Sequence, residues 1–166
     1  MDYIPVSILF ISFGLMVFQD IKYRHIHIGL PILVFAASVY VYRNSISIWE
    51  VLNTAFFILI NFVAITMYFS IKNSKFQNPF KRYIGIGDLL FLIAVIPLFS
   101  FRNYVLFFIS GMIVSLLLYV VFQNRSSQKT IPLAGYLSLY IILLMITNLF
   151  VSINIFYDFI IWVPII

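Results

Sequence analysis

The sequence predicts an all-α membrane protein, a polytopic bundle of about six transmembrane helices with its amino terminus outside. Three observations lead to this fold class. Hydrophobic residues make up 64% of the 166 residues and charged residues only 9%, the apolar residues form long runs, and the basic residues gather in alternate loops. So few polar groups cannot cover the surface of a water-soluble domain. We therefore expect residues 1–166 to form a single transmembrane domain.

Six apolar runs define the expected spans, at about residues 4–18, 28–41, 51–71, 89–99, 104–122 and 133–150. A helix needs roughly 20 residues to cross the bilayer core, so Asp20 is expected at the end of the first helix and not in a long loop. Pro97 should shorten or kink the fourth span. The apolar region 152–166 is interrupted by Asn154 and Asp158 and is too short to be assigned as a seventh span.

The start of the chain predicts a retained span. Asp2 is the only charged residue before the first apolar run, and no small-residue cleavage site follows that run. A secretory signal carries a basic segment and such a site. The first segment is therefore expected to stay in the membrane.

The distribution of basic residues predicts the orientation. The loops after spans one, three and five hold eight of the ten basic residues, whereas the other side holds Arg43 and Arg102. Basic residues are enriched in cytoplasmic loops, so the amino terminus is expected outside and the site at the cytoplasmic side of the plasma (inner) membrane. Basic and aromatic residues alternate in region 72–82, which predicts anchoring to anionic lipids at that leaflet.

Composition also excludes several kinds of chemistry. The chain has no cysteine, which excludes disulfides, thiol catalysis and cysteine-bound metal. His25 and His27 are the only histidines, too few for a metal site, and no cofactor is expected. The net charge of +5 is explained by topology, with no basic domain for nucleic acid. Carboxylates remain as the candidate reactive groups.

Two of the five acidic residues are the candidate catalytic pair. Asp20 lies where the first span ends and Asp88 where the fourth begins, so the predicted topology puts both at one membrane face. Two nearby aspartates share a proton because both cannot ionise together, and the ionised one can then activate water. From helix-end electrostatics alone, the resting proton is expected more often on Asp20, at a helix carboxyl end, than on Asp88, at an amino end.

The segment Gly85-Ile86-Gly87-Asp88 supplies the second half of this site. Hydrolysis of a peptide bond in a helical substrate requires its backbone to be unwound and held extended. Gly85 and Gly87 permit close backbone approach next to Asp88, and non-helical backbone at this depth is tolerated where it lines a wet cavity. We therefore expect both glycines to support the substrate backbone.

These segments resemble the type IV prepilin peptidases, membrane aspartic peptidases with a Gly-x-Gly-Asp signature. The second motif is similar at Gly85-Ile86-Gly87-Asp88, and the first at Asp20-Ile21-Lys22-Tyr23-Arg24-His25-Ile26. A weaker third similarity is Ile131-Pro132-Leu133-Ala134-Gly135-Tyr136-Leu137, at the start of the last span. The chain departs from the family pattern at His27-Ile28, where Pro-Asn is common, and at Leu90, where Lys is common.

The resemblance implies an aspartic endopeptidase that removes the leader of type IV prepilin-like precursors at the cytoplasmic face, with Asp20 and Asp88 catalytic. The absence of cysteine fits the compact form of the family, which lacks the cysteine-bearing amino-terminal region of the larger enzymes, so the resemblance implies no methyltransferase activity. The alternative from the residues is a non-enzymatic membrane subunit or a small proton- or cation-coupled transporter. Such a transporter would need acids nearer the bilayer centre and often repeated halves, and the sequence shows neither.

Overall fold

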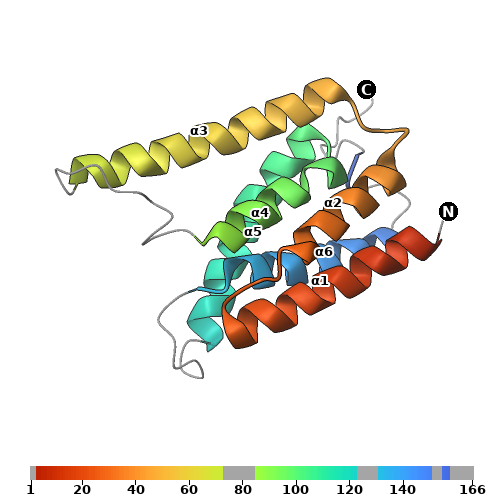
Figure 1. The fold of residues 1–166 in the computed structure, drawn as a ribbon, viewed down its shortest axis with the longest axis horizontal. Helices are drawn as coiled ribbons and strands as arrows, with labels where there is room; N and C mark the ends of the chain where they lie inside the picture. The colour runs from red at the N-terminus through yellow and green to blue at the C-terminus, as the bar shows by residue number, and fades with distance from the viewer. Residues whose placement is uncertain (1–2, 73–84, 123–130, 151–154, 158–166) are drawn as a thin grey trace, which may run out of the picture.

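The computed structural model describes residues 3–72, 85–122, 131–150 and 155–157, and these are almost entirely helical. These described residues form six α-helices in succession, with a short 3₁₀ turn, η2 (Ile96–Leu98), after the fourth. The helices are α1 (Tyr3–Tyr23), α2 (Gly29–Tyr42), α3 (Ile48–Lys72), α4 (Ile86–Ala94), α5 (Phe101–Phe122) and α6 (Leu133–Phe150). The predicted all-α class is confirmed (Figure 1).

Four of the six helices are long and apolar enough to cross a membrane: α1, α3, α5 and α6. The other two are shorter, since α2 has 14 residues and α4 has 9 before η2. At 1.5 Å per residue, α2 is only about 21 Å long, which is less than the ~30 Å thickness of a bilayer core. The prediction of a multi-pass membrane protein is therefore confirmed for four candidate spans.

Pro97 interrupts the fourth helix as predicted. Regular α-helix ends at Ala94, and Pro97 lies in η2, which turns the chain toward α5. Proline lacks the N–H that a helix interior requires and its ring clashes with the preceding turn. Because the regular helix ends before Pro97, α4 is short, and the chain bends between α4 and α5 (Figure 1).

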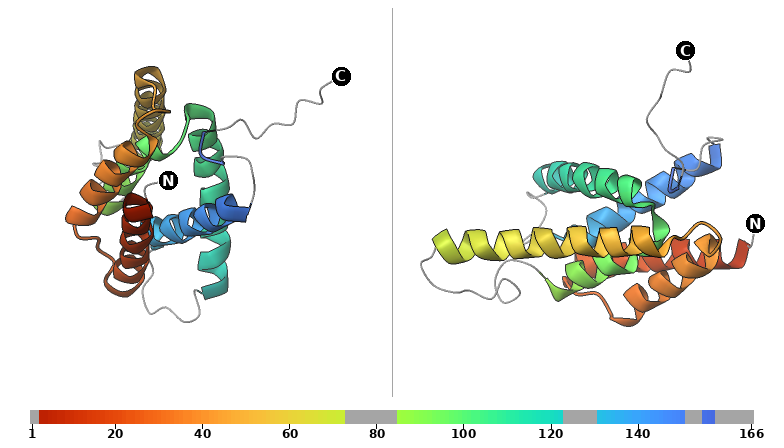
Figure 2. Two further views of the ribbon diagram at one scale, coloured as in Figure 1. Left: turned by 90° about the vertical axis from the view of Figure 1, so that its right-hand side faces the viewer. Right: turned by 90° about the horizontal axis from the view of Figure 1, so that it is seen from above.

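The helices alternate in direction, so their ends form two groups. In Figure 1 the carboxyl ends of α1, α3 and α5 and the amino ends of α2, α4 and α6 lie toward the left of the view. Helix α1 packs against α2 and α6, α6 also packs against α5, and α4 packs against α2 and α6. Helix α3 runs along the edge of the molecule, where it contacts α5 and η2 (Figures 1 and 2).

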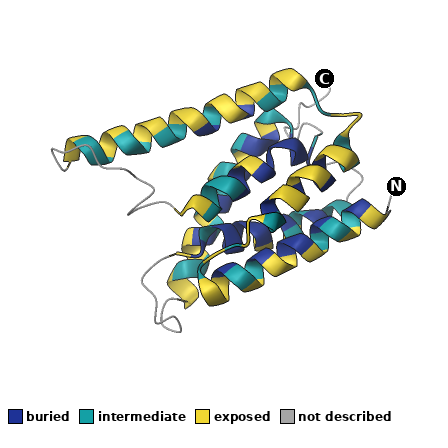
Figure 3. Ribbon diagram, in the orientation of Figure 1, coloured by how far each residue is buried: buried dark blue, intermediate teal, exposed yellow. Residues whose placement is uncertain are grey.

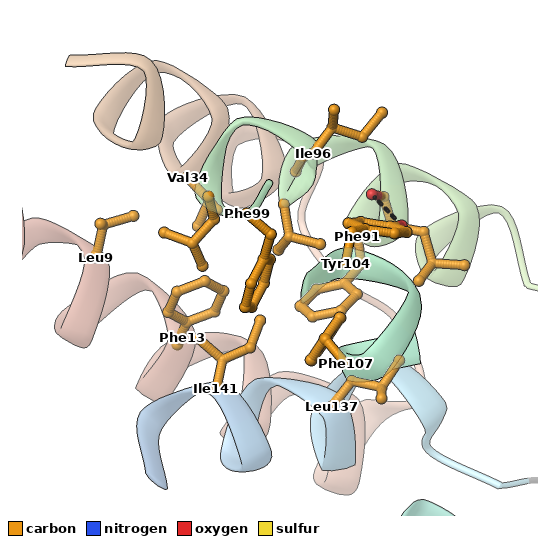
Figure 4. Close-up of a cluster of buried hydrophobic side chains, with 14 of the residues drawn as sticks. Leu9, Phe13, Val34, Phe91, Ile96, Phe99, Tyr104, Phe107, Leu137 and Ile141 are labelled. Atoms are coloured by element: carbon orange, nitrogen blue, oxygen red, sulfur yellow. Dashed lines mark hydrogen bonds between the residues drawn. The ribbon is translucent and has the colours of Figure 1, made fainter. Parts of the chain in front are cut away.

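An aromatic core joins α1, α4, η2 and α5. Phe13 of α1 meets Phe91 of α4 edge-on with ring centroids 6.3 Å apart, and Phe99 stacks on Phe107 at 4.8 Å. The buried hydroxyl of Tyr104 donates to the carbonyl of Leu92 at 3.0 Å (Figure 4). Exposed residues run along the long helices (Figure 3). Many of them are large and hydrophobic, as expected for surfaces against lipid.

The turn at residues 155–157 packs at the end opposite the predicted site. Phe156 is buried against Phe99, its carbonyl accepts from Ser100 N at 2.9 Å, and the hydroxyl of Tyr157 donates to Pro97 O at 2.8 Å. This part of the apolar region 152–166 therefore packs into the bundle next to η2. The remainder of that region lies outside the described residues.

Candidate active site

Asp20 lies in the last turn of α1, as predicted, and is buried with only 7% of its surface exposed. Its Oδ2 accepts a hydrogen bond from the amide of Gly135, at a distance of 2.6 Å. A carboxylate in so dry a position needs such donors, because burying an unpaired charge is costly. The Gly135 amide is therefore part of what allows an acid at this point of α1.

Asp88 occupies the first turn of α4 and is half-buried. Its Oδ1 accepts from the amide of Ala134 at 3.0 Å, and its carboxylate also accepts from the amide of Gly85, the residue that caps α4. The second bond has the form of a capping box, in which the third helical residue reaches back to the cap amide. Asp88 thus closes the start of its own helix while contacting α6.

The structure brings the two predicted acids together on one helix end. Ala134 and Gly135 are consecutive residues in the first turn of α6, and consecutive α carbons are only about 3.8 Å apart. The carboxylates of Asp20 and Asp88 bind these two amides and interact electrostatically with each other. The first amides of a helix have no partner within the helix and carry its positive dipole end, so they suit two acidic groups.

Sequence reasoning missed this role of the α6 amino end. Ala134 and Gly135 carry no reactive side chain, and their contribution comes only from backbone N–H groups. Pro132, immediately before α6, is the available signal, because proline favours a helix start and leaves free amides after it. The weak similarity noted at 131–137 therefore lies at the center of the site.

The two predicted glycines differ in their surroundings. A Cβ added at Gly85 would lie 3.0 Å from Oδ2 of Asp88, whereas one at Gly87 would approach nothing nearer than Ile26 Cβ at 3.8 Å. Gly135, which was not predicted, resembles Gly85, since its Cβ would lie 3.1 Å from both Cβ and Oδ2 of Asp20. The missing side chain therefore leaves room for Asp88 at Gly85 and for Asp20 at Gly135, whereas Gly87 makes room for neither acid.

The connection between α1 and α2, residues 24–28, runs beside the acids. Ile26 packs near Gly87, and the amide of His27 donates to Gln19 Oε1 at 2.9 Å. His27 Nδ1 in turn accepts from Gly29 N at 3.2 Å, which holds the start of α2. His27, one of the two departures from the pattern described in the sequence analysis, therefore stabilises the local backbone. Leu90, the second departure, is a half-buried residue of α4.

The described residues contain no group of three or more metal-binding side chains. His25 and His27 are both exposed on the connection. The basic region 72–82 that was predicted to anchor lipid lies outside the described residues, apart from Lys72 at the end of α3. The described site is therefore two carboxyl groups, their backbone donors and the connection at 24–28.

The fold and the site define a class, a multi-pass helical membrane protein with a paired carboxylate at one end of its bundle. In comparisons with known proteins, no family model, no curated protein and no solved structure matches the chain. What the paired carboxylate does is therefore argued from its geometry.

Proposed function

We propose that the chain is an aspartic endopeptidase of the prepilin-peptidase type, which cleaves the leader of type IV prepilin-like precursors at the membrane interface. The observation that carries the proposal is the meeting of Asp20 and Asp88 on consecutive amides of α6. Two acids held this close cannot both ionise at low cost, so one carries a proton that the other lacks. This difference is what acid–base activation of water requires.

The reaction follows from that difference. The ionised carboxylate takes a proton from water while the water oxygen bonds to the carbon of the scissile carbonyl. The protonated carboxyl donates its proton to the carbonyl oxygen, which gives a gem-diol. A proton then moves to the amide nitrogen, the C–N bond breaks, and a carboxylic acid and an amine leave. The sum is the addition of one water molecule.

The surroundings of Asp88 support access to a peptide. Gly85 and Ile86 are exposed, whereas Asp20 is buried on the other side of the pair. An extended substrate backbone can therefore approach over the cap of α4, where Gly85 presents no side chain. The position also favours a peptidase over a transporter, because Asp20 is three residues from the end of α1 and not near its middle.

We further propose that all six helices lie in the plasma membrane, the two short ones with the help of a thinned bilayer or of tilted neighbours. Among the described residues, Lys22, Arg24 and Lys72 lie near the end that carries the acids, and Arg43 and Arg102 near the other end. By the positive-inside rule the site then faces the cytoplasm. Its substrate is a membrane precursor with a basic leader.

The test uses the purified chain in liposomes that contain anionic lipid, with a prepilin-like precursor as substrate and mass spectrometry to locate the cut. Asp20→Asn and Asp88→Asn should each lower the rate at least 100-fold, the range expected for loss of acid–base catalysis. Glu50→Gln is the matched control, because it removes an acid at the opposite end of the bundle, in the first turn of α3.

Cleavage by Asp20→Asn or Asp88→Asn at the parental rate would refute the dyad. If the parent does not cleave but takes up protons or cations when a gradient is imposed, the transporter alternative holds.

A further inference from the structure

Arg24 has an unusual backbone conformation for a residue with a side chain. It follows the last residue of α1 with φ of 57°, the one non-glycine residue with positive φ in the described part of the chain. Its amide donates to Asp20 O at 3.1 Å, the bond that ends a helix with a left-handed residue. Glycine is the usual residue there because a Cβ destabilises this conformation.

The guanidinium of Arg24 is an electrostatic neighbour of Asp20. Its Nη1 atom is shielded from solvent, although Tyr23 and His25 on either side are exposed. The guanidinium interacts electrostatically with Asp20 and with Tyr136, a buried residue of α6 that follows Gly135. A left-handed arginine therefore directs a positive charge into the region where α1 meets α6.

Lys22, the other cation of this turn, behaves differently. Its Nζ lies 5.0 Å from the ring centroids of both Phe18 and Tyr23, two exposed side chains of α1. The two cations are therefore two residues apart in sequence but serve different surfaces. Lys22 provides a matched control for the charge of Arg24.

We propose that Arg24 is a positioning residue that holds Asp20 charged and directed at Gly135, so that Asp20 is the base and Asp88 carries the proton. This inference rests on the proposed peptidase function. Helix ends alone predicted the reverse, but the amino end of α6 donates to both acids, and Asp20 has in addition the cation Arg24 as an electrostatic neighbour. Asp88 has amide donors but, among its described electrostatic neighbours, faces only the negative Asp20.

The groups that face Asp20 come from three directions. Arg24 lies on the connection after α1, Asp88 on α4 and Tyr136 on α6, while Tyr119 of α5 interacts with Tyr136. Within the part of the chain that the structure describes, Arg24 is the only cation among these groups. Removal of its charge should therefore act on Asp20 in a way that changes of the exposed histidines do not.

The experiment compares Arg24→Gly, Arg24→Gln, Arg24→Lys and Lys22→Gln in the liposome cleavage assay, with thermal unfolding of each variant in detergent. Arg24→Gly should unfold at the parental temperature or higher, because glycine suits the left-handed backbone, yet cleave at least tenfold more slowly. In Arg24→Gln the acidic limb of the kcat/KM profile should move up by about one pH unit, the size of effect a neighbouring cation has. Arg24→Lys should restore part of the rate, and Lys22→Gln should match the parent.

The proposal is overturned if Arg24→Gly cleaves at the parental rate with an unchanged pH profile, since Arg24 would then only cap α1. If the parent itself does not cleave, the proposed function fails and the inference is tested by infrared spectroscopy. In the Asp88→Asn background, the protonated-carboxyl band that Asp20→Asn abolishes should appear at higher pH once Arg24→Gln is added. No change in that titration would reject the role of Arg24 independently of catalysis.

Discussion

The amide of Gly135 lies 2.6 Å from Oδ2 of Asp20, a residue 115 positions earlier in the chain. The contact depends on glycine, because a Cβ at position 135 would lie 3.1 Å from that same oxygen. Gly135 therefore contributes in two ways: its amide binds Asp20, and its lack of a side chain leaves room for the carboxylate. Any substitution at Gly135 should act on Asp20 first.

Gly135→Ala should lower cleavage about tenfold or more. The added methyl group pushes the Asp20 carboxylate away from the amide, and a hydrogen bond to a charged group contributes about 1.5–3 kcal/mol. The initial rate in liposomes measures the effect, and thermal unfolding shows whether the fold persists. A fully active Gly135→Ala protein would mean that this hydrogen bond does not hold Asp20 for catalysis.

The glycines of the Gly-x-Gly-Asp segment should respond unequally. Gly85→Ala places a methyl group 3.0 Å from Asp88 Oδ2 and should reduce the rate several-fold, whereas at Gly87 the nearest contact is an ordinary 3.8 Å. Gly87→Ala should therefore be close to parental in the same assay. Equal losses in both variants would instead point to the substrate, since the contacts within the chain differ.

Gly111→Ala should destabilise the packing of α5 on α6. Its Cβ would lie 2.6 Å from Cδ2 of Leu137, a fully buried side chain. Overpacking of this kind costs about 1–3 kcal/mol and should lower the unfolding temperature in detergent. Gly14 is the matched control because nothing lies within 4 Å of its added Cβ, and Gly14→Ala should raise stability by about 0.5–1 kcal/mol.

Phe156→Ala should lower stability by about 3 kcal/mol, the usual effect of emptying a buried aromatic site. Phe156 is 2% exposed and its ring lies 5.1 Å from that of Phe99. The loss should loosen η2, which lies beside this turn, and through η2 the end of α4, and so reduce cleavage as well. Phe56→Ala on the exposed face of α3, where the ring is 62% exposed, should leave the unfolding temperature unchanged.

The sequence was informative where a residue type conflicts with its surroundings. Asp20 and Asp88 could be identified because they are acidic residues next to apolar runs, and Pro97 predicted that α4 ends early. Four candidate spans follow from apolar length alone, but α2 is too short to be assigned as a span from its own length.

The donors at Ala134 and Gly135 could not be identified in the same way. They are backbone groups in an apolar run, and only the packing of α6 against α1 and α4 gives them a role. In the sequence, Arg24 is one of eight basic residues that predict the topology and part of the basic stretch after Asp20. The direction of the Arg24 side chain depends on the left-handed backbone conformation at the end of α1. No local pattern of residue types predicted that conformation.

The place of α6 in the chain has a consequence for biosynthesis. A nascent chain that has inserted α1 through α5 already holds both aspartates but neither of the amides that bind them. Its two acids lack the helix end on which they converge, so the carboxylate pair is incomplete until residues 134 and 135 have been made and α6 has docked. Under the proposed function, hydrolysis then starts only after α6 has joined the bundle.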